Sequence, residues 1–181
     1  MKEITFITGN QNKADYLAKF LGHPVKHVKL DLDELQSLDL NILIEHKVRQ
    51  AYEKTQSPVI VEDSSFAFEA LGGLPGPFIK FFVDNMPLKD ICAMVKDKSR
   101  IATARCIFGY YDGKILKIIE GSKKGEVADE PSGSNGWDWD QIFIPEGSKV
   151  TMASLNDEDY QKTYLEIKPF AELKEFLATI N

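Results

Sequence analysis

Apolar runs and stretches of helical period alternate along the first third of the chain. The apolar runs are rich in Ile, Val, Phe and Thr, which is typical of buried strands. The stretches between them repeat apolar residues every three or four positions, which is typical of helices that pack on one side. This β-α-β-α-β order predicts an α/β fold. The predicted strands span 2–8, 25–30 and 58–63, and the predicted helices span 12–21 and 40–56.

The middle of the chain predicts an antiparallel ribbon. Asp112–Gly113 separates two strand-like runs at 100–111 and 114–121, and a DG pair in that position strongly indicates a hairpin. Residues 123–128 and 142–145 predict two further short strands. We therefore expect a mixed sheet with one long antiparallel ribbon, in a single domain that covers residues 1–181.

Gly and Pro mark where regular structure stops. Residues 71–77, with the sequence LGGLPGP, predict a loop, and short helices are expected at 78–85 and 88–96. A second loop is expected at 129–136. Residues 169–180 predict an amphipathic C-terminal helix that has Pro169 at its first position.

Composition narrows the class of protein. The chain has 181 residues, of which 43% are hydrophobic and 28% charged, so it can bury a core without disulfides or metals. It contains no run of 18 apolar residues, so we expect no membrane span. Its N-terminus shows no basic segment followed by an apolar stretch, so we expect a cytoplasmic protein.

Charge and cysteine usage exclude further classes. The net charge of −6 and the presence of only three arginines argue against a broad surface for a nucleic acid polymer. A local basic cleft stays compatible with this charge. Cys92 and Cys106 lack metal-ligand spacing and are expected to be reduced thiols. The three histidines also lack such spacing, so no zinc site is expected.

Two lysines are candidates for binding phosphate. Thr8-Gly9-Asn10-Gln11-Asn12-Lys13 joins a predicted strand to a predicted helix, and a helix start offers backbone N–H groups to an anion. An ordinary strand–turn–helix joint with a solvated Lys13 is the alternative. Lys47 lies on the apolar side of its predicted helix. It either extends outward to solvent or meets an anionic partner.

Two acidic segments are candidates for holding a metal. Glu62-Asp63 ends a predicted strand, and open α/β sheets bind ligands beyond the carboxyl ends of their strands. Successive strand side chains point to opposite faces, so one of these acids faces the site and the other faces away. Glu34, after another strand, is placed to meet it. Two carboxylates with phosphate oxygens suit Mg²⁺. Solvated loop acids are the alternative.

A turn with two tryptophans is the candidate for binding a flat base. Gly136-Trp137-Asp138-Trp139-Asp140 offers two rings for stacking and a carboxylate that accepts hydrogen bonds from ring N–H groups. The alternative is that one or both tryptophans anchor the core.

These segments, in this order, resemble the inosine triphosphate pyrophosphatase family, which hydrolyses non-canonical purine nucleoside triphosphates. The resemblance runs over nearly the whole chain. The stretch at 59–82, which contains LGGLPGP followed by Ile79-Lys80, is highly specific. The other matching stretches are 4–13 and 136–147.

The resemblance implies an α/β fold of two lobes around a long mixed β-sheet, with flanking helices and a central cleft. It also implies a homodimer, Mg²⁺ as cofactor and a nucleoside triphosphate as substrate. The implied reaction is attack of water at the α-phosphorus, which releases a nucleoside monophosphate and pyrophosphate.

The resemblance also implies roles for individual residues. The turn that cradles the triphosphate in the family is matched by Thr8, Gly9, Asn10 and Lys13, and its phosphate-clamping lysines by Lys47 and Lys80. The acids that hold metal and activate water are matched by Glu34 and Asp63, and Ser64 follows Asp63 in the substrate-binding segment. The residues that stack on and recognise the base are matched by Trp137, Trp139 and Asp140.

One departure from the family concerns base recognition. The family has Ser-His-Arg before its last helix, where His and Arg contact the 6-oxo group of the purine. An alignment without gaps places Leu165-Glu166 there, and a shift of two residues places Ile167-Lys168 there. The shifted register also lets Lys162 match a family lysine and Lys168 replace the arginine in part. We therefore expect a pyrophosphatase with altered or relaxed base specificity.

Two other functions stay open from the sequence. The missing His-Arg pair is compatible with a nucleotide-binding or sensing protein that has little turnover. If the resemblance is set aside, the LGGLPGP and GWDWD segments of an unspecialised α/β domain would serve a protein interface.

Overall fold

The computed structural model describes residues 5–22, 25–136 and 138–180. The chain divides into two compact units. Unit 1 comprises Met1–Asp63, Ile107–Glu120 and Pro169–Asn181, and unit 2 comprises Ser64–Cys106 and Gly121–Lys168. Two such units agree with the two lobes that the family resemblance implies.

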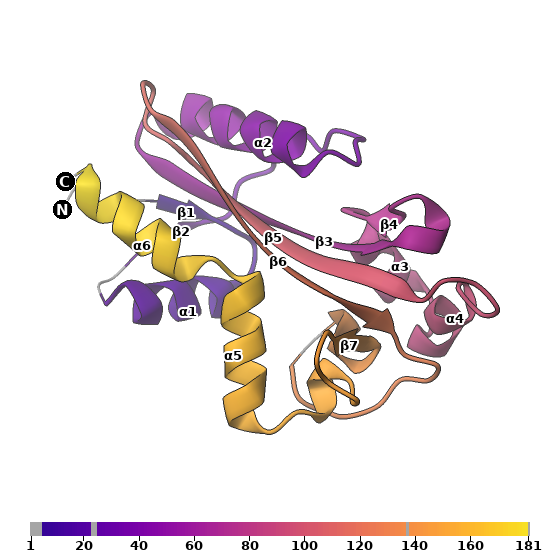
Figure 1. The fold of residues 1–181 in the computed structure, drawn as a ribbon. Helices are drawn as coiled ribbons and strands as arrows, with labels where there is room; N and C mark the ends of the chain where they lie inside the picture. Colours follow the sequence, from indigo (N-terminus) through magenta and orange to yellow (C-terminus); the bar gives the residue numbers. More distant parts are fainter. Residues whose placement is uncertain (1–4, 23–24, 137, 181) are drawn as a thin grey trace. The chain divides into compact units, whose positions relative to one another are not determined.

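A mixed sheet has the strand order β2-β1-β3-β5-β6-β7, with β4 paired to β3 (Figure 1). β1 is parallel to both β2 and β3, whereas the pairs β3–β4 and β6–β7 are antiparallel. The expected mixed sheet is therefore confirmed, and β5 and β6, which correspond to the expected ribbon, are neighbours in it. The strands are β1 Thr5–Ile7, β2 Lys26–Val28, β3 Val59–Phe68, β4 Pro75–Gly76, β5 Ile101–Tyr111, β6 Leu116–Val127 and β7 Phe143–Pro145.

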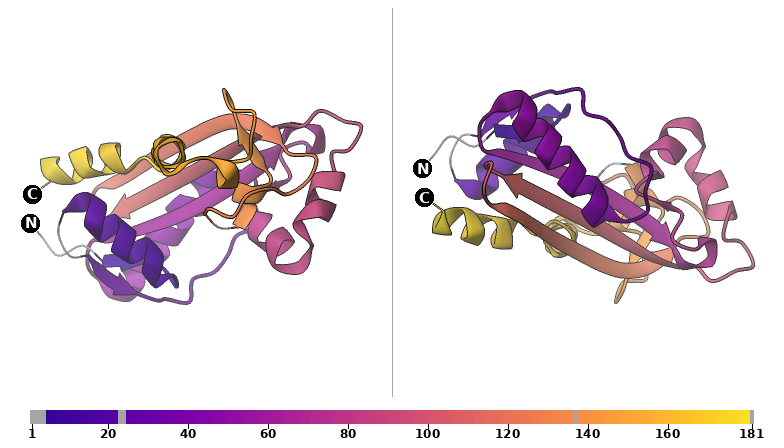
Figure 2. Two further views of the ribbon diagram at one scale, coloured as in Figure 1. Left: turned by 90° about the horizontal axis from the view of Figure 1, so that it is seen from below. Right: turned by 90° about the horizontal axis from the view of Figure 1, so that it is seen from above.

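Three helices belong to unit 1, and they lie on the two faces of its strands. α2 (Leu40–Thr55) covers one face, and α1 (Gln11–Leu21) and α6 (Phe170–Thr179) cover the other (Figures 1 and 2). α1 begins at its N-cap Asn10 and ends at Gly22, whose φ of 78° suits glycine. The apolar stripe of α2 is buried in a core with β1 and β3. The hydrophobic periodicity therefore predicted α1, α2 and α6 correctly.

Unit 2 packs its elements around a cluster of aromatic rings. Phe66 contacts Phe68, Phe143 and Trp139 at ring-centroid distances of 4.9, 5.4 and 5.9 Å. Phe66, Phe68 and Phe143 are fully buried, so these rings form the core of the unit. The helices of the unit are α3 Ile79–Asn85, α4 Leu88–Ala93 and α5 Asp157–Ile167, with 3₁₀ turns at Glu69–Leu71, Asp138–Gln141 and Met152–Ser154.

Four sequence-based expectations about elements were wrong. Residues 71–77 were expected to form a loop, but Pro75–Gly76 within them form β4. β3 does not stop at residue 63 but continues to Phe68, because its second half pairs with β4. β6 runs unbroken to Val127, so residues 123–128 belong to the same strand as 116–121. α5 was not expected at all, although its buried residues Thr163, Tyr164 and Ile167 have helical spacing.

The predicted hairpin is present, and its turn is held by a side chain. Oδ1 of Asp112 accepts hydrogen bonds from the backbone N–H groups of Lys114 and Ile115, at 2.9 and 2.8 Å. Gly113 has a φ of 92°, which a glycine adopts without strain. Both cysteines are free thiols, and both are buried. Within the described residues, none of the helices is long and apolar enough to cross a membrane.

Candidate active site

The turn between β1 and α1 is ordered by its own side chains. Oγ1 of Thr8 accepts a hydrogen bond from the backbone N–H of Asn10 at 3.1 Å. Oδ1 of Asn10 in turn accepts from the backbone N–H of Lys13 at 3.4 Å, which caps the helix. Gly9 and Asn10 are exposed, so the turn presents its backbone to solvent. This is the arrangement expected of an anion site at a helix start, and α1 has no acid in its first turn that would repel an anion.

Lys13 reaches back from this turn to β3. Its Nζ lies 3.0 Å from Oε1 of Glu62, whose side chain is only 4% exposed. A carboxylate this deeply buried requires a compensating cation, and Lys13 supplies one. The lysine predicted to bind phosphate is therefore held at a fixed place by an acid that the sequence had left without a role.

Asp63 points to the other face of β3 and meets α2. Its Oδ2 accepts from Nζ of Lys47 at 2.6 Å, and both side chains are 19% exposed. The same ammonium lies 3.8 Å from Oε1 of Glu34, a largely exposed acid in the loop after β2. Of the two alternatives that the sequence left open for Lys47, the structure therefore shows the anionic partner rather than extension to solvent. The alternation of side chains along β3 separates the acids as expected, but both lie inside the strand rather than at its end.

The donor set formed by Glu34 and Asp63 fits Mg²⁺. Both side chains offer hard carboxylate oxygens, and both approach one ammonium, so they converge on the same place. No cluster of three or more His, Cys, Asp or Glu suited to a metal occurs in the part of the chain that the structure describes. Mg²⁺ usually takes only one or two carboxylates and completes its shell with water and phosphate oxygens.

The candidate base-binding turn in unit 2 contains a buried carboxylate. Asp140 is 6% exposed, and its Oδ2 accepts from the phenol of Tyr160 on α5 at 2.8 Å. Gly136 permits this arrangement: a Cβ there would lie 1.9 Å from Oδ2 of Asp140 and 2.5 Å from the hydroxyl of Tyr160. The turn, the carboxylate and the phenol therefore form one close-packed group.

Trp139, the second tryptophan of this turn, packs partly against the core. The ring of Trp139 is stacked on that of Phe66 with an interplanar angle of 13°, and its side chain is partly buried. One of its faces therefore serves the core, which agrees with the core-anchor alternative for this residue. Trp137, predicted to stack on the base, lies outside the described residues.

Lys168 is a buried cation at the end of α5. It is 8% exposed, and its Nζ donates to Oγ of Ser64 at 3.3 Å. Close packing fixes the end of α5 in this position, because a Cβ on Gly121 of β6 would lie 2.5 Å from the carbonyl oxygen of Ile167. Lysine is almost never buried without partners, so the placement of Lys168 beside Ser64 is a specific feature of unit 2.

Lys80 and Lys162 are on the surface of unit 2. Lys80 forms an ion pair with Asp84 one turn later in α3, at 2.7 Å, and its side chain is 70% exposed. Lys162 is exposed and borders a shallow hollow together with Lys123 and Glu166. Tyr160, two residues earlier and on a different side of α5, is the residue that contacts Asp140.

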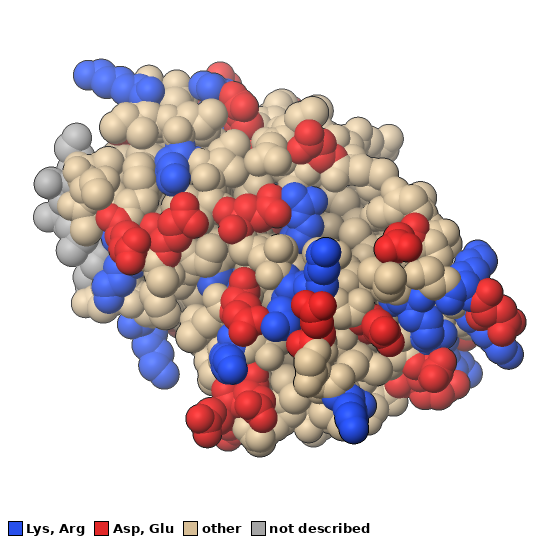
Figure 3. All heavy atoms as spheres, in the orientation of Figure 1, with Lys and Arg blue, Asp and Glu red and all other residues tan. Residues whose placement is uncertain are grey.

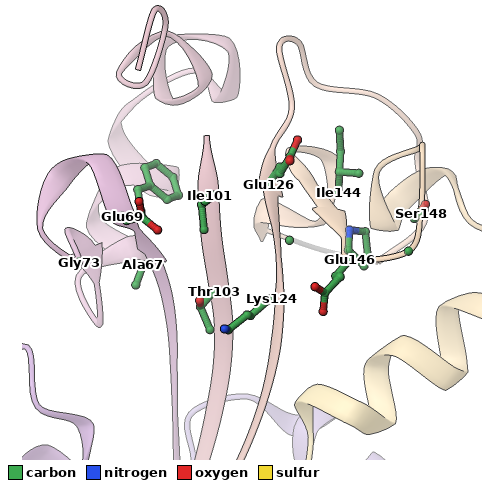
Figure 4. Close-up of a pocket in the computed structure, with 14 residues that line it drawn as sticks. Ala67, Glu69, Gly73, Ile101, Thr103, Lys124, Glu126, Ile144, Glu146 and Ser148 are labelled. Carbon is green, nitrogen blue, oxygen red and sulfur yellow. The ribbon is translucent and has the colours of Figure 1, made fainter. Parts of the chain in front are cut away.

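A hollow of about 650 Å³ lies on the other face of the sheet in unit 2 (Figure 4). Ala67, Thr103, Lys124 and Ile144 line it from four different strands. The alternate residues of those strands, such as Phe66 and Phe143, point into the core instead. Gly73 of the LGGLPGP segment lines this hollow, but none of the described candidate catalytic, metal-binding or substrate-binding residues does, so we do not assign the chemistry to it.

Acidic and basic side chains are interspersed over the face that Figure 3 shows. The basic side chains discussed above, Lys13, Lys47 and Lys80, each have an acidic partner.

Sequence comparison places the chain among known proteins. A model of the Ham1 family matches residues 4–176. The chain is 35% identical to inosine triphosphate pyrophosphatase 1 of Trypanosoma cruzi, over 95% of this chain and 90% of that protein. It is 34% identical to inosine triphosphate pyrophosphatase of Schizosaccharomyces pombe, over 98% and 96% of the two chains. It is 33% identical to a dITP/XTP pyrophosphatase of Saccharolobus solfataricus, over 97% and 93%.

Solved structures agree with the fold. The Ham1 protein of Staphylococcus aureus superposes with a TM-score of 0.85, covering 99% of this chain and 100% of that chain at 23% sequence identity. A HAM1 protein from Coxiella burnetii superposes with a TM-score of 0.84, at the same coverage and identity. This chain, an α/β protein with a long mixed sheet and flanking helices, therefore shares the fold of these Ham1 proteins.

Proposed function

This chain belongs to the Ham1 family, and we propose that it is a nucleoside-triphosphate pyrophosphatase that acts on non-canonical or modified nucleotides. It releases a nucleoside monophosphate and pyrophosphate, with base specificity altered or relaxed relative to the family. Unit 1 carries most of the groups that act on the triphosphate, and unit 2 carries Lys80 and the groups that recognise the base. The observation that carries this proposal is the pairing of Lys47 with both Asp63 and Glu34.

The triphosphate is bound by backbone amides and lysines. Thr8, Gly9 and Asn10 direct the turn toward the phosphates, and Lys13 adds a charge that Glu62 holds in place. Lys47 and Lys80 supply further cations. Phosphoryl transfer needs positioning and positive charge more than covalent help from the protein, and these residues supply both.

Asp63 orients the attacking water and accepts its proton. A carboxylate oxygen can take a proton in the transition state when it lies within hydrogen-bond distance of the water. Lys47 donates to Oδ2 of Asp63 and so fixes the direction of the carboxylate. Because the lysine also approaches Glu34, binding of an anionic substrate and a cation would redistribute these contacts within the same group.

Glu34 and Asp63 are the residues that would hold Mg²⁺. The ion supplies Lewis-acid stabilisation of developing negative charge on phosphate oxygens when it is bound. The exposed position of Glu34 leaves room for the waters that Mg²⁺ keeps.

The base is recognised by the turn at Gly136–Asp140 and by α5. Trp137 and Trp139 provide aromatic surface, and Asp140 accepts hydrogen bonds from N–H groups of the base. Tyr160 fixes the direction of the Asp140 carboxylate. Lys168, with Ser64, offers a cationic donor in place of the arginine that the family resemblance implies. Lys162, exposed on the same helix, supplies a further cation to the substrate.

A lysine does not reproduce what His and Arg provide together. Arg presents a planar fork that binds bidentately, whereas Lys is a point charge. A site rejects a base without a 6-oxo group because that base leaves polar groups of the protein unpaired. This chain has fewer polar groups of that kind. This is why we propose altered specificity.

We also propose that the chain is cytoplasmic, and that its single domain forms a homodimer. Light scattering of the purified protein tests the homodimer.

A pyrophosphate-release screen with Mg²⁺ tests the function. The panel holds inosine, xanthosine, common and damaged nucleoside triphosphates, in ribo and deoxy forms. Turnover of a set broader than, or different from, inosine and xanthosine triphosphates supports the proposal. A strict preference for those two contradicts the altered specificity. Binding without turnover of any member indicates the nucleotide-sensing alternative instead.

A further inference from the structure

Both ring nitrogens of His27 in β2 lie within hydrogen-bond distance of the turn at 8–13. Nε2 is 2.5 Å from the backbone carbonyl oxygen of Thr8, and Nδ1 is 2.9 Å from Oε1 of Gln11. Thr8 opens the turn that we propose to bind phosphates, and Gln11 is the first residue of α1. His27 therefore links the two sides of that turn.

Both partners of His27 are hydrogen-bond acceptors. The Thr8 carbonyl can only accept, so Nε2 donates to it. The amide nitrogen of Gln11 donates to Oδ1 of Asp15 at 2.8 Å, and this leaves Oε1 directed at His27. Exchanging the oxygen and nitrogen of Gln11 would set its oxygen against the Asp15 carboxylate. Nδ1 of His27 therefore also donates.

Only the imidazolium form of histidine donates from both nitrogens. We propose that His27 is a protonated positioning residue, which braces the turn at 8–13 and adds positive charge beside the bound phosphates. This inference rests on the proposed function of the turn. A neutral His27 must give up one of its two hydrogen bonds, and it loses its attraction for the anion.

Among the described residues, the charged groups near His27 come from α1, β2 and the residue after β2. On α1, Asp15 favours the imidazolium through Gln11, whereas Lys13 is balanced by Glu62 of β3. On the other side are Lys26 and Lys29, both exposed. β1 (Thr5–Ile7) carries no titratable side chain.

Lys29 is a basic side chain that lies beside the turn. A Cβ built on Gly9 would lie 3.8 Å from its Cε, so the alkyl chain of Lys29 extends along the turn. Its ammonium opposes the charging of His27, but in water this repulsion is weak compared with a direct hydrogen bond to a fixed acceptor. The two acceptors and Asp15 therefore decide the protonation of the ring.

A consequence is that affinity for a polyphosphate depends on the protonation of His27. Histidine changes its charge between about pH 5 and 8. At the acid end of this range His27 donates hydrogen bonds to both Thr8 and Gln11 and carries a positive charge. At the alkaline end it loses one of these hydrogen bonds and the charge, so polyphosphate binding weakens.

Nuclear magnetic resonance of the ¹⁵N-labelled full chain reads the proton count directly. The long-range ¹H–¹⁵N spectrum of the ligand-free protein at pH 6 should show protons on both nitrogens of His27, with the signals assigned by their loss in His27→Gln. A ring with one proton at pH 6 overturns the inference.

Binding of inorganic tripolyphosphate without metal, measured by calorimetry at pH 6 and pH 8, tests the consequence. The gain in affinity on acidification should be about fivefold larger in the wild type than in His27→Gln, a ratio that cancels the titration of the probe itself. Equal gains overturn the inference.

Asp15→Asn, which frees Gln11 to turn around, should reduce the gain without altering His27. Glu45→Gln, which removes an acid paired with Arg49 on α2, should leave it unchanged.

The outcomes separate this inference from the proposed function. A neutral ring with normal pyrophosphatase activity overturns the role of His27 alone. Failure of the wild type to bind tripolyphosphate at either pH contradicts the phosphate-binding role of the turn, and with it both proposals. If His27→Gln does not fold, the wild-type spectrum and the Asp15→Asn pair decide the matter.

Discussion

Nζ of Lys47 lies 2.6 Å from Oδ2 of Asp63, a contact between the middle of α2 and the middle of β3. The lysine comes from the apolar side of its helix, and without an acidic partner it would carry an uncompensated charge into a half-buried place. The pair therefore explains why a lysine occurs there. It also gives Asp63 the fixed direction that a general base requires.

Replacing Asp63 by Asn should abolish most turnover. Asn keeps the size of the side chain but cannot accept a proton from water, so kcat should fall by about 10²–10⁴-fold while the protein stays folded. Pyrophosphate release measures the rate, and circular dichroism checks the fold. Glu53→Gln, an exposed acid on the same helix as Lys47, is the control and should keep wild-type activity. Near-normal turnover in Asp63→Asn would remove Asp63 from the chemistry.

Replacing Tyr160 by Phe should weaken base recognition more than chemistry. Loss of the hydrogen bond to Asp140 leaves a buried carboxylate less well oriented, and a bond to a charged group contributes about 1.5–3 kcal/mol, so KM should rise at least severalfold. We expect kcat to change less than about twofold, since the phenol does not face the phosphates in this account. Tyr164→Phe, one turn later on α5, is the matched control. An equal effect of both substitutions would indicate a structural role.

Replacing Lys168 by Met should change which bases are accepted. Met fills a similar volume without the ammonium, so the kcat/KM ratio of inosine to adenosine triphosphate should fall toward one. The thermal midpoint should not decrease, because a nearly buried ammonium loses solvation on folding. Lys168→Arg should retain or raise the ratio. An unchanged ratio in Lys168→Met would show that Lys168 does not recognise the base.

Cys92 should be unreactive in the folded protein. Burial raises its pKa to about 11 from the ordinary 9.0, so at pH 8 its thiolate is about a hundredfold scarcer than that of an exposed thiol. Iodoacetamide should label it quickly only after denaturation, as followed by mass spectrometry. Because the folded state favours the neutral thiol, the free energy of unfolding falls as the pH rises from about 9 to about 11. Rapid labelling of the native protein would contradict this burial.

Much of the fold was predictable because its elements are locally marked. The periodicity of α2 and the DG turn of the hairpin sit within short stretches of sequence. The second half of β3 was missed because Glu62-Asp63-Ser64 interrupts the apolar pattern, and its pairing with β4 is a contact that the pattern does not contain. α5 was overlooked, although Asn156 as N-cap and three acids in the first turn indicate a helix.

The candidate site was predictable by residue type but not by partner. The alternation rule separated Glu62 from Asp63, yet it could not show that Glu62 meets Lys13, 49 positions earlier in the chain. Tyr160 was missed because a tyrosine in a region without a predicted helix gives no functional signal. The two acceptors of His27 come from different elements, so its proton count becomes visible only when both distances are known.

Hydrolysis in ¹⁸O-labelled water is the measurement that tests the central claim most directly. Wild-type protein with Mg²⁺ and inosine triphosphate is allowed to turn over, and mass spectrometry locates the label. Attack at the α-phosphorus places one ¹⁸O in the nucleoside monophosphate and none in pyrophosphate, and this is the result that we predict. Label in pyrophosphate, or release of inorganic phosphate instead, would contradict the account.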